Sequence, residues 1–341
     1  VTALAEGPDG RIYAGGEGEI FTIEAGTVTQ RLSTDTPGTP VVFAIYVDAR
    51  GGLWWGDGVG LAYRKGSHSR RVGPADKLKL SGVQVIARMR DGQIWVGGFG
   101  GLAQFVGQAF TTFDTEDGLP SANTRPILRT RDGTLWVGTA DGLARRRGGR
   151  FEAFGVQHGL PGRYIMTLTE DRQGRLWVGT DRGLAVRTKD ADFQAYSLGP
   201  SPGDGAVSAI REDSAGRIWV GQADRGIYRI DTEGHAELVP IAHHTFSFPR
   251  ILMARDGRVW LSADDGLLLL QGDEVRHYGV ADGLAHDSPA FMVEDEHGHI
   301  WFSYRSGAGL TRFDGNEFRT WTTQDGLAHN SVYSLGFDNQ G

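Results

Sequence analysis

The chain has 341 residues, with 35 basic and 42 acidic side chains, 52 Gly, 9 Trp and no Cys. The absence of Cys excludes a disulfide framework and any zinc or iron–sulfur site with Cys ligands. The formal net charge of -7 argues against a nucleic-acid partner, which needs a basic face. No apolar run approaches the roughly 18 residues that a membrane span needs, so none is predicted.

A repeated motif organises the chain from its beginning. The motif is Gly, any residue, an aliphatic residue, an aromatic residue, and then two small or apolar residues. It recurs eight times at spacings of 41 or 42 residues, which excludes coincidence. The aromatic positions are Tyr13, Trp54, Trp95, Trp136, Trp177, Trp219, Trp260 and Trp301.

Each unit predicts four short strands separated by Gly- and Asp-rich turns. In the fourth unit we expect strands over residues 124–130, 134–139, 142–147 and 151–154. The strands are apolar on both faces, so each sheet should be covered on both sides. These features predict an all-β fold, a β-propeller of four-stranded blades, with eight blades expected and seven as the alternative. The aromatic side chain should fill the gap between neighbouring blades, and the Gly two residues later should permit close backbone approach.

Residues 1–341 are expected to form a single β-propeller of eight repeats. Residues 331–341 match the first strand of a repeat, and would be an extra strand for closure or the start of a ninth repeat. The chain does not begin with Met, and we expect a mature or excised segment of a longer protein.

A string in the fourth repeat resembles a known family. Residues 117–120 read Asp-Gly-Leu-Pro, 135–139 read Leu-Trp-Val-Gly-Thr, and 142–143 read Gly-Leu. This resembles the two-component regulator propeller repeat, and the resemblance covers nearly the whole chain. It implies a periplasmic or extracellular sensor domain of a bacterial histidine kinase or diguanylate cyclase, with the effector domain on the same longer chain. The implied ligand is a small molecule or oligosaccharide, and association as a homodimer is also considered.

We call one side of the blades the rim face: it carries the turn between the second and third strands and the loop to the next blade. Ligands bind such faces in many propellers because loops from every blade converge there. Residues that differ between repeats on this face are the candidate ligand-binding residues, since Arg and aromatic side chains suit sugar acids and other anions. They are Phe99, Arg125, Arg163, Tyr164, Arg182, Arg225, His286, Tyr304, Arg305 and His329.

No catalytic residue, metal site or cofactor is predicted. Eight of the ten His follow residue 234, but His297 and His299 fall on the opposite side of a blade from His286 and His329. Acidic pairs such as Glu170-Asp171 recur at one register before the aromatic, which indicates bonds to turn amides and not paired catalytic carboxylates.

Three functional hypotheses remain open at this point. The first is a non-catalytic sensor propeller that binds a carbohydrate or small anion. The second is a streptogramin-lyase-like enzyme, because those propellers also carry Gly-x-Ile-Trp repeats; His286 and His329 would then act with a metal. The third is a protein-interaction scaffold.

Overall fold

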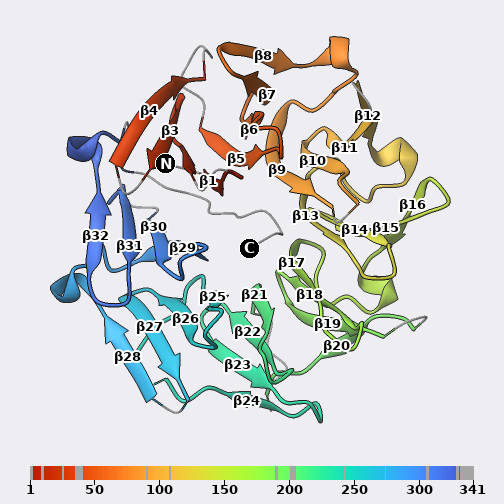
Figure 1. The fold of residues 1–341 in the computed structure, drawn as a ribbon. Helices are drawn as coiled ribbons and strands as arrows, with labels where there is room; N and C mark the ends of the chain where they lie inside the picture. The colour runs from red at the N-terminus through yellow and green to blue at the C-terminus, as the bar shows by residue number, and fades with distance from the viewer. Residues whose placement is uncertain are drawn as a thin grey trace. The chain divides into compact units, whose positions relative to one another are not determined.

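The computed structural model describes residues 3–8, 11–24, 27–34, 41–89, 91–106, 109–188, 191–199, 205–241, 243–272, 274–304, 307–327 and 330. These residues form eight antiparallel sheets of four strands, each with its strands hydrogen-bonded in chain order (Figure 1). The fold is an eight-bladed, all-β propeller, and the seven-bladed alternative is wrong. The predicted strand over 331–335 lies outside the described residues, so its role and the extent of one domain over 1–341 stay predictions.

The blades fall into two compact units. Unit 1 spans Val1–Thr112 and Tyr278–Gly341, and unit 2 spans Phe113–His277. Unit 1 contains blade 1 (β1 Ala3–Glu6, β2 Ile12–Gly15, β3 Glu19–Glu24, β4 Thr27–Ser33), blade 2 (β5 Val42–Val47, β6 Leu53–Asp57, β7 Gly60–Lys65, β8 His68–Val72), blade 3 (β9 Gly82–Arg88, β10 Ile94–Phe99, β11 Gly101–Val106, β12 Ala109–Phe113) and blade 8 (β29 Pro289–Glu294, β30 Ile300–Tyr304, β31 Leu310–Phe313, β32 Phe318–Trp321).

Unit 2 contains the remaining four blades, which follow one another in chain order in Figure 1. They are blade 4 (β13 Thr124–Arg129, β14 Leu135–Thr139, β15 Gly142–Arg147, β16 Arg150–Phe154), blade 5 (β17 Ile165–Glu170, β18 Leu176–Thr180, β19 Gly183–Arg187, β20 Gln194–Tyr196), blade 6 (β21 Val207–Glu212, β22 Ile218–Gln222, β23 Gly226–Ile230, β24 Ala236–Leu238) and blade 7 (β25 Arg250–Met253, β26 Val259–Ala263, β27 Gly266–Gln271, β28 Glu274–Tyr278). The strands predicted for the fourth repeat agree with blade 4 to within one residue at each end.

Within each unit, the repeated aromatic residue packs against the next blade, as expected. Trp136 of blade 4 shares a buried cluster with Ile165, Val178 and Ala185 of blade 5. In unit 1, Trp301 of blade 8 shares one with residues of blade 1. The seven Trp of the series are 0–5 % exposed. Burial of a large aromatic ring of this kind stabilises the contact between two blades.

Gly179, two positions after the aromatic Trp177, allows blades 5 and 6 to approach closely. A Cβ on Gly179 would lie 2.6 Å from the carbonyl oxygen of Val207, in the first strand of the next blade. Real Cβ atoms do not approach backbone that closely, so any larger residue would push blade 6 away from blade 5.

The Asp-Gly-Leu segments form short turns that join successive blades. In each turn, a three-residue 3-10 helix ends at the residue before the Gly, and the Gly that follows has a positive φ. The Leu is buried: Leu160 lies in the cluster between blades 4 and 5. The turn after β8 has the same form although Lys77 replaces the Gly, with φ 63°. The five helices are η1 Pro74–Asp76, η2 Thr115–Asp117, η3 Val156–His158, η4 Val280–Asp282 and η5 Thr323–Asp325.

Candidate functional site

The antiparallel strand order fixes which residues reach the rim face. The second and fourth strands of each sheet run toward it, so the turn after the second strand and the loop after the fourth lie at the same end. Arg182 and Arg225 occupy corresponding turns of blades 5 and 6, each directly before the Gly that starts the third strand. Both are exposed, as are Arg163 and His286, and Phe99 is 44 % exposed.

Some predicted residues come together and others do not. The Arg125 guanidinium lies 5.6 Å from the ring centre of Tyr164 across blades 4 and 5. Arg163 lies 3.4 Å from the carboxylate of Asp141. Arg225 lines a pocket of its own, to which no other predicted residue contributes. Arg305 and His329 lie outside the described residues, so their assignment to a ligand site stays a prediction.

Tyr304 differs from the other predicted residues because its side chain is buried. It is 0 % exposed, and its hydroxyl donates to Thr311 Oγ1 at 2.9 Å. Burial raises the pKa of the Tyr304 hydroxyl to about 12, although its hydrogen bonds oppose the shift. Tyr304 occupies the register of Thr139 and Thr180, which are also buried. This placement makes the residue part of the packing at the end of β30, beneath the rim face.

The pocket beside Arg225, here called the rim pocket, lies between blades 6 and 7 and has a volume of about 430 Å³. Its apolar lining is Ile227, Leu238, Val239, Ile241 and Phe246, with Gly226. Its polar lining is Asp224, Arg225, His244, Thr245, Ser247 and Asp264. Leu238 is 54 % exposed, a large apolar surface for a residue beside a cavity. An apolar floor with a few polar groups at the edge is typical of small-molecule sites.

Hydrogen bonds fix the loop that forms one wall of the rim pocket. The Asp224 amide donates to the Phe246 carbonyl at 2.9 Å, and the Asp264 amide donates to the Thr245 carbonyl at 2.9 Å. The Ser247 amide and hydroxyl both donate to the Asp264 carboxylate. The wall is therefore tied to the turns of both blades, and the pocket is formed before any ligand arrives.

The charged lining of the rim pocket consists of two carboxylates, those of Asp224 and Asp264, and one guanidinium, that of Arg225. Among the residues that the structure describes, the Arg225 guanidinium makes no hydrogen bond or ion pair, whereas the Asp264 carboxylate is bonded to Ser247. A guanidinium without a partner offers forked N–H donors to a carboxylate or phosphate. The arrangement suits a ligand with an apolar face and an anionic or polyhydroxyl group.

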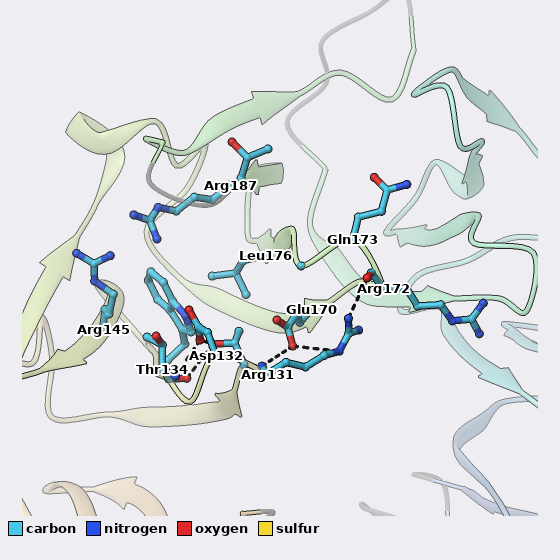
Figure 2. A pocket seen from close by; sticks show the side chains of 13 residues that line it. Arg131, Asp132, Thr134, Arg145, Glu170, Arg172, Gln173, Leu176 and Arg187 are labelled. Atoms are coloured by element: carbon cyan, nitrogen blue, oxygen red, sulfur yellow. Dashed lines mark hydrogen bonds and ion pairs between the residues drawn. The ribbon is translucent and has the colours of Figure 1, made fainter.

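A second pocket lies between blades 4 and 5 on the side opposite the rim face, with a volume of about 370 Å³ (Figure 2). We call it the turn pocket, and its charged lining is Arg131, Asp132, Arg145, Glu170, Arg172 and Arg187. Figure 2 shows Arg131 directed toward Glu170, with dashed lines marking its bonds.

The cations of the turn pocket already have partners. Arg131 donates through its guanidinium to the Asp171 carbonyl at 2.8 Å, and its amide donates to Glu170 at 2.8 Å. Arg145 forms an ion pair with Glu152, and Arg187 donates to the Ala191 carbonyl at 2.6 Å. The Arg131 bonds join the turns of blades 4 and 5, and the other two lie within a single blade. The pocket is therefore better explained by packing within and between these blades than by ligand recognition.

The recurring acidic pairs have the structural role that their register predicts. The Asp171 carboxylate accepts hydrogen bonds from the Gln173 amide (3.0 Å), the Arg175 amide (2.8 Å) and the Trp177 indole (2.7 Å). Asp213 and Asp295 accept from the same positions of their own turns. Each Asp therefore connects its turn to the buried Trp.

Electrostatics at Asp213 agree with that role. Burial acts to raise the pKa of the Asp213 carboxyl, but hydrogen bonds from Trp219 and Arg217 outweigh it and lower the pKa. The carboxylate is therefore held ionised as a hydrogen-bond acceptor, which is the opposite of what a general acid requires.

Three groups of His and acidic residues have the proximity that a metal ion needs. They are Asp231, Glu233 and His235; Asp295, His297 and His299; and His244, Asp265 and His277. In the first two groups the Asp carboxylate already accepts two amide hydrogen bonds of its own turn. The third group brings together a loop, a turn and a strand.

Leu238, His244 and Phe246 shape the rim pocket and were not among the residues predicted from the sequence. The sequence offered one indication, which is the absence of a repeated turn. The loop over residues 239–249 carries no Asp-Gly-Leu turn, unlike the loops after blades 3, 4, 7 and 8. A loop that departs from the repeat takes its own path, and its side chains become candidates for specificity.

Part of the repeat matches a known protein family. The model of the two-component regulator propeller family matches residues 159–182. No curated protein matches the chain. Among the described residues, no helix is long and apolar enough to cross a membrane.

Several solved structures share the fold. The extracellular domain of BT4673, assigned to a one component system of B. thetaiotaomicron, is 17 % identical with a TM-score of 0.53, covering 94 % of this chain and 52 % of that one. PorZ, a surface component of the type-IX secretion system of Porphyromonas gingivalis, is 15 % identical with a TM-score of 0.53, covering 98 % and 54 %. Virginiamycin B lyase from Staphylococcus aureus is 13 % identical with a TM-score of 0.53, covering 88 % and 90 %.

At these identities the likeness is one of fold. The chain spans about half the length of the BT4673 and PorZ structures. A propeller is indicated by three features: the strand pattern, the aromatic register and the family match at residues 159–182. The chain is an eight-bladed β-propeller, and its residues 159–182 match the model of the two-component regulator propeller family.

Proposed function

We propose that this propeller is the ligand-binding sensor domain of a bacterial signal-transduction receptor, and that it binds a carbohydrate or small anionic ligand without converting it. The observation that carries the proposal is the rim pocket. It combines a preformed apolar floor, the exposed side chain of Leu238 and the guanidinium of Arg225, which has no partner among the residues that the structure describes.

The receptor context rests on the repeat and on the fold neighbours. The two-component regulator propeller model matches residues 159–182 of the chain. The extracellular domain of BT4673 has the same fold. We therefore place the domain in the periplasm or outside the cell, within a longer chain that carries a kinase or cyclase effector. Blades packed on both faces are stiff, so a bound ligand would act through contacts between domains or between the two copies of a homodimer.

The group at the site that would recognise an anion is the Arg225 guanidinium, beside the carboxylates of Asp224 and Asp264. Arg225 can donate two parallel hydrogen bonds to a carboxylate. Loss of a charge-assisted pair of this kind costs about 1.5–3 kcal/mol, or roughly 10- to 150-fold in affinity. A sugar acid satisfies both the apolar floor and the guanidinium, because the ring has an apolar face and the carboxylate is planar.

The test is a thermal-shift and calorimetric screen of the chain against neutral oligosaccharides, uronic acids and small organic anions. We expect saturable binding of an anionic saccharide or small anion that Arg225→Ala weakens at least tenfold. Arg182→Ala is the matched control, because Arg182 holds the same turn position one blade earlier but does not line the rim pocket. If the rim pocket is the site, Arg182→Ala should leave the affinity unchanged. Equal affinity in wild type and Arg225→Ala would reject the rim pocket as the site.

The same samples separate the other two hypotheses. Mass spectrometry of the ligand after incubation reports turnover, and a product lost in His286→Ala or on addition of a chelator would favour the lyase hypothesis. The His286 side chain is exposed, and its Nδ1 accepts a hydrogen bond from the Ser288 amide at 3.1 Å. Capture of a folded protein partner in the absence of any small-molecule binding would favour the scaffold hypothesis.

A further inference from the structure

Two imidazoles and a carboxylate meet at the rim face of blade 7. His244 comes from the loop before the blade, Asp265 from the turn between β26 and β27, and His277 from β28. One nitrogen or oxygen atom of each residue lies within 4.8 Å of the corresponding atoms of the other two. Residues separated by up to 33 positions in the sequence (244 to 277) thus converge on one point.

The distances between these groups are close to those of a metal coordination shell. His244 Nδ1 lies 2.8 Å from the nearer carboxylate oxygen of Asp265, and His277 Nε2 lies 2.9 Å from the Asp265 carbonyl oxygen. A tetrahedral zinc ion with bonds of about 2.0–2.2 Å spaces its ligand atoms by about 3.3 Å. The three candidate ligand atoms lie within 4.8 Å of one another, so side-chain movements of up to about 1.5 Å would bring them to this spacing.

The carboxylate of this group differs from those of the two turn clusters. Asp231 and Asp295 use their carboxylates to accept amide hydrogen bonds within their own turns. Among the residues described, the Asp265 carboxylate accepts only from His244. Its lone pairs are available to a cation, whereas an ion at the other two clusters would compete with the turn.

The structure also positions the two imidazoles. Their rings lie 4.9 Å apart, centre to centre, and His244 has only 16 % of its side chain exposed. Hydrogen bonds of the neighbouring Thr245 and Phe246 to adjacent turns fix the loop that carries His244. His243, the residue before it, has a φ of 69°, a strained value for a side chain other than Gly.

We propose that His244, Asp265 and His277 form a binding site for a divalent transition-metal ion of the zinc type. Two neutral imidazoles and one carboxylate are a ligand set that zinc favours, and three protein ligands leave a fourth position open. His244 also lines the rim pocket, so a bound ion lies at the edge of that pocket and adds positive charge beside it. The site does not depend on the proposed function, because metal binding is measured with the metal alone.

The experiment is a calorimetric titration of the chelator-treated 341-residue chain with ZnCl2. We expect one zinc ion per chain, with the affinity reduced by about 100-fold or more in His244→Ala and in His277→Ala. His235→Ala is the matched control: His235 is an exposed His of a turn cluster, and its removal should leave stoichiometry and affinity unchanged. Circular dichroism of each variant reports whether it is folded.

A second variant and a second measurement test the proposal if an Ala variant fails to fold. His277→Gln keeps the size of the side chain at an exposed strand position and should also lose the high-affinity zinc. The visible absorption of bound Co²⁺ reports a four- or five-coordinate site with imidazole ligands in wild type, and this signal should vanish in His277→Gln. Zinc binding of unchanged affinity in both His277 variants, or no zinc binding by the wild-type chain, would overturn the proposal.

Discussion

Replacement of Asp171 by Ala is the sharpest test of how the repeat holds its blades together. Asp171 is 0 % exposed, and its carboxylate joins a turn to the indole of Trp177, which is also 0 % exposed. The substitution removes the acceptor for the Trp177 indole, for two turn amides and for the Arg175 guanidinium at 2.5 Å.

The magnitude follows from which donors can reach water. The turn amides and Arg175 are partly exposed and can be hydrated, so each loses about 0.5–1.5 kcal/mol. The Trp177 indole N–H cannot be hydrated in place, and an unsatisfied buried donor costs about 1–3 kcal/mol. We expect Asp171→Ala to lower the free energy of unfolding by about 3–5 kcal/mol, the range for removal of one partner from a buried pair.

The assay is urea unfolding followed by Trp fluorescence and far-ultraviolet circular dichroism. Asp256→Ala is the matched control, because Asp256 pairs with Arg258 in the equivalent turn of blade 7 but is 47 % exposed. Loss of that exposed pair should cost no more than about 1 kcal/mol. Equal losses of unfolding free energy in Asp171→Ala and Asp256→Ala would show that the buried Asp171 carboxylate does not hold the turn to Trp177.

Three further predictions concern single positions in the turns and in the core. Gly159→Ala should destabilise the chain by about 1–3 kcal/mol, because φ is 90° and the new Cβ would lie 1.9 Å from the Phe193 carbonyl oxygen; an unchanged urea midpoint would show that the turn yields. Lys77→Gly should instead stabilise it by about 0.5–1 kcal/mol, because Lys77 has a φ of 63° and left-handed backbone costs a residue with a Cβ about 1–2 kcal/mol, partly offset by the entropy of Gly; a lower midpoint would contradict this. Tyr304, with a pKa raised to about 12, keeps its proton while the unfolded chain loses it, so stability should fall by about 2.7 kcal/mol between about pH 10 and 12. Tyr304→Phe should lose this contribution to the pH dependence, and pH-dependent unfolding that is identical in the two proteins would reject the assigned burial.

The repeat made the fold predictable to a fine level. The aromatic register located every blade, and the strand limits of blade 4 came within one residue of the structure. The same register could have placed Tyr304 correctly, because it lies three residues after Trp301, as Thr139 does after Trp136, and that position is buried in each blade. Comparing repeats position by position was therefore more informative than the side-chain chemistry of Tyr304 alone.

The rim pocket could not be predicted in the same way. Its wall is a loop without the repeated turn, and its path depends on hydrogen bonds to Asp224 and Asp264, which lie in the turns of two different blades. The position of Arg225 followed from the register, but its apolar neighbours did not. The meeting of His244 with His277 has the same origin, because a loop and a strand far apart in sequence supply the two rings.

The most direct test of the central claim is calorimetric titration of wild type and Arg225→Ala with an anionic saccharide found in the screen, with the ligand recovered afterwards for mass spectrometry. We expect one saturable site, an affinity at least tenfold weaker in Arg225→Ala, an unchanged affinity in Arg182→Ala, and intact ligand. Equal affinities in wild type and Arg225→Ala, or recovery of a converted product, would contradict it.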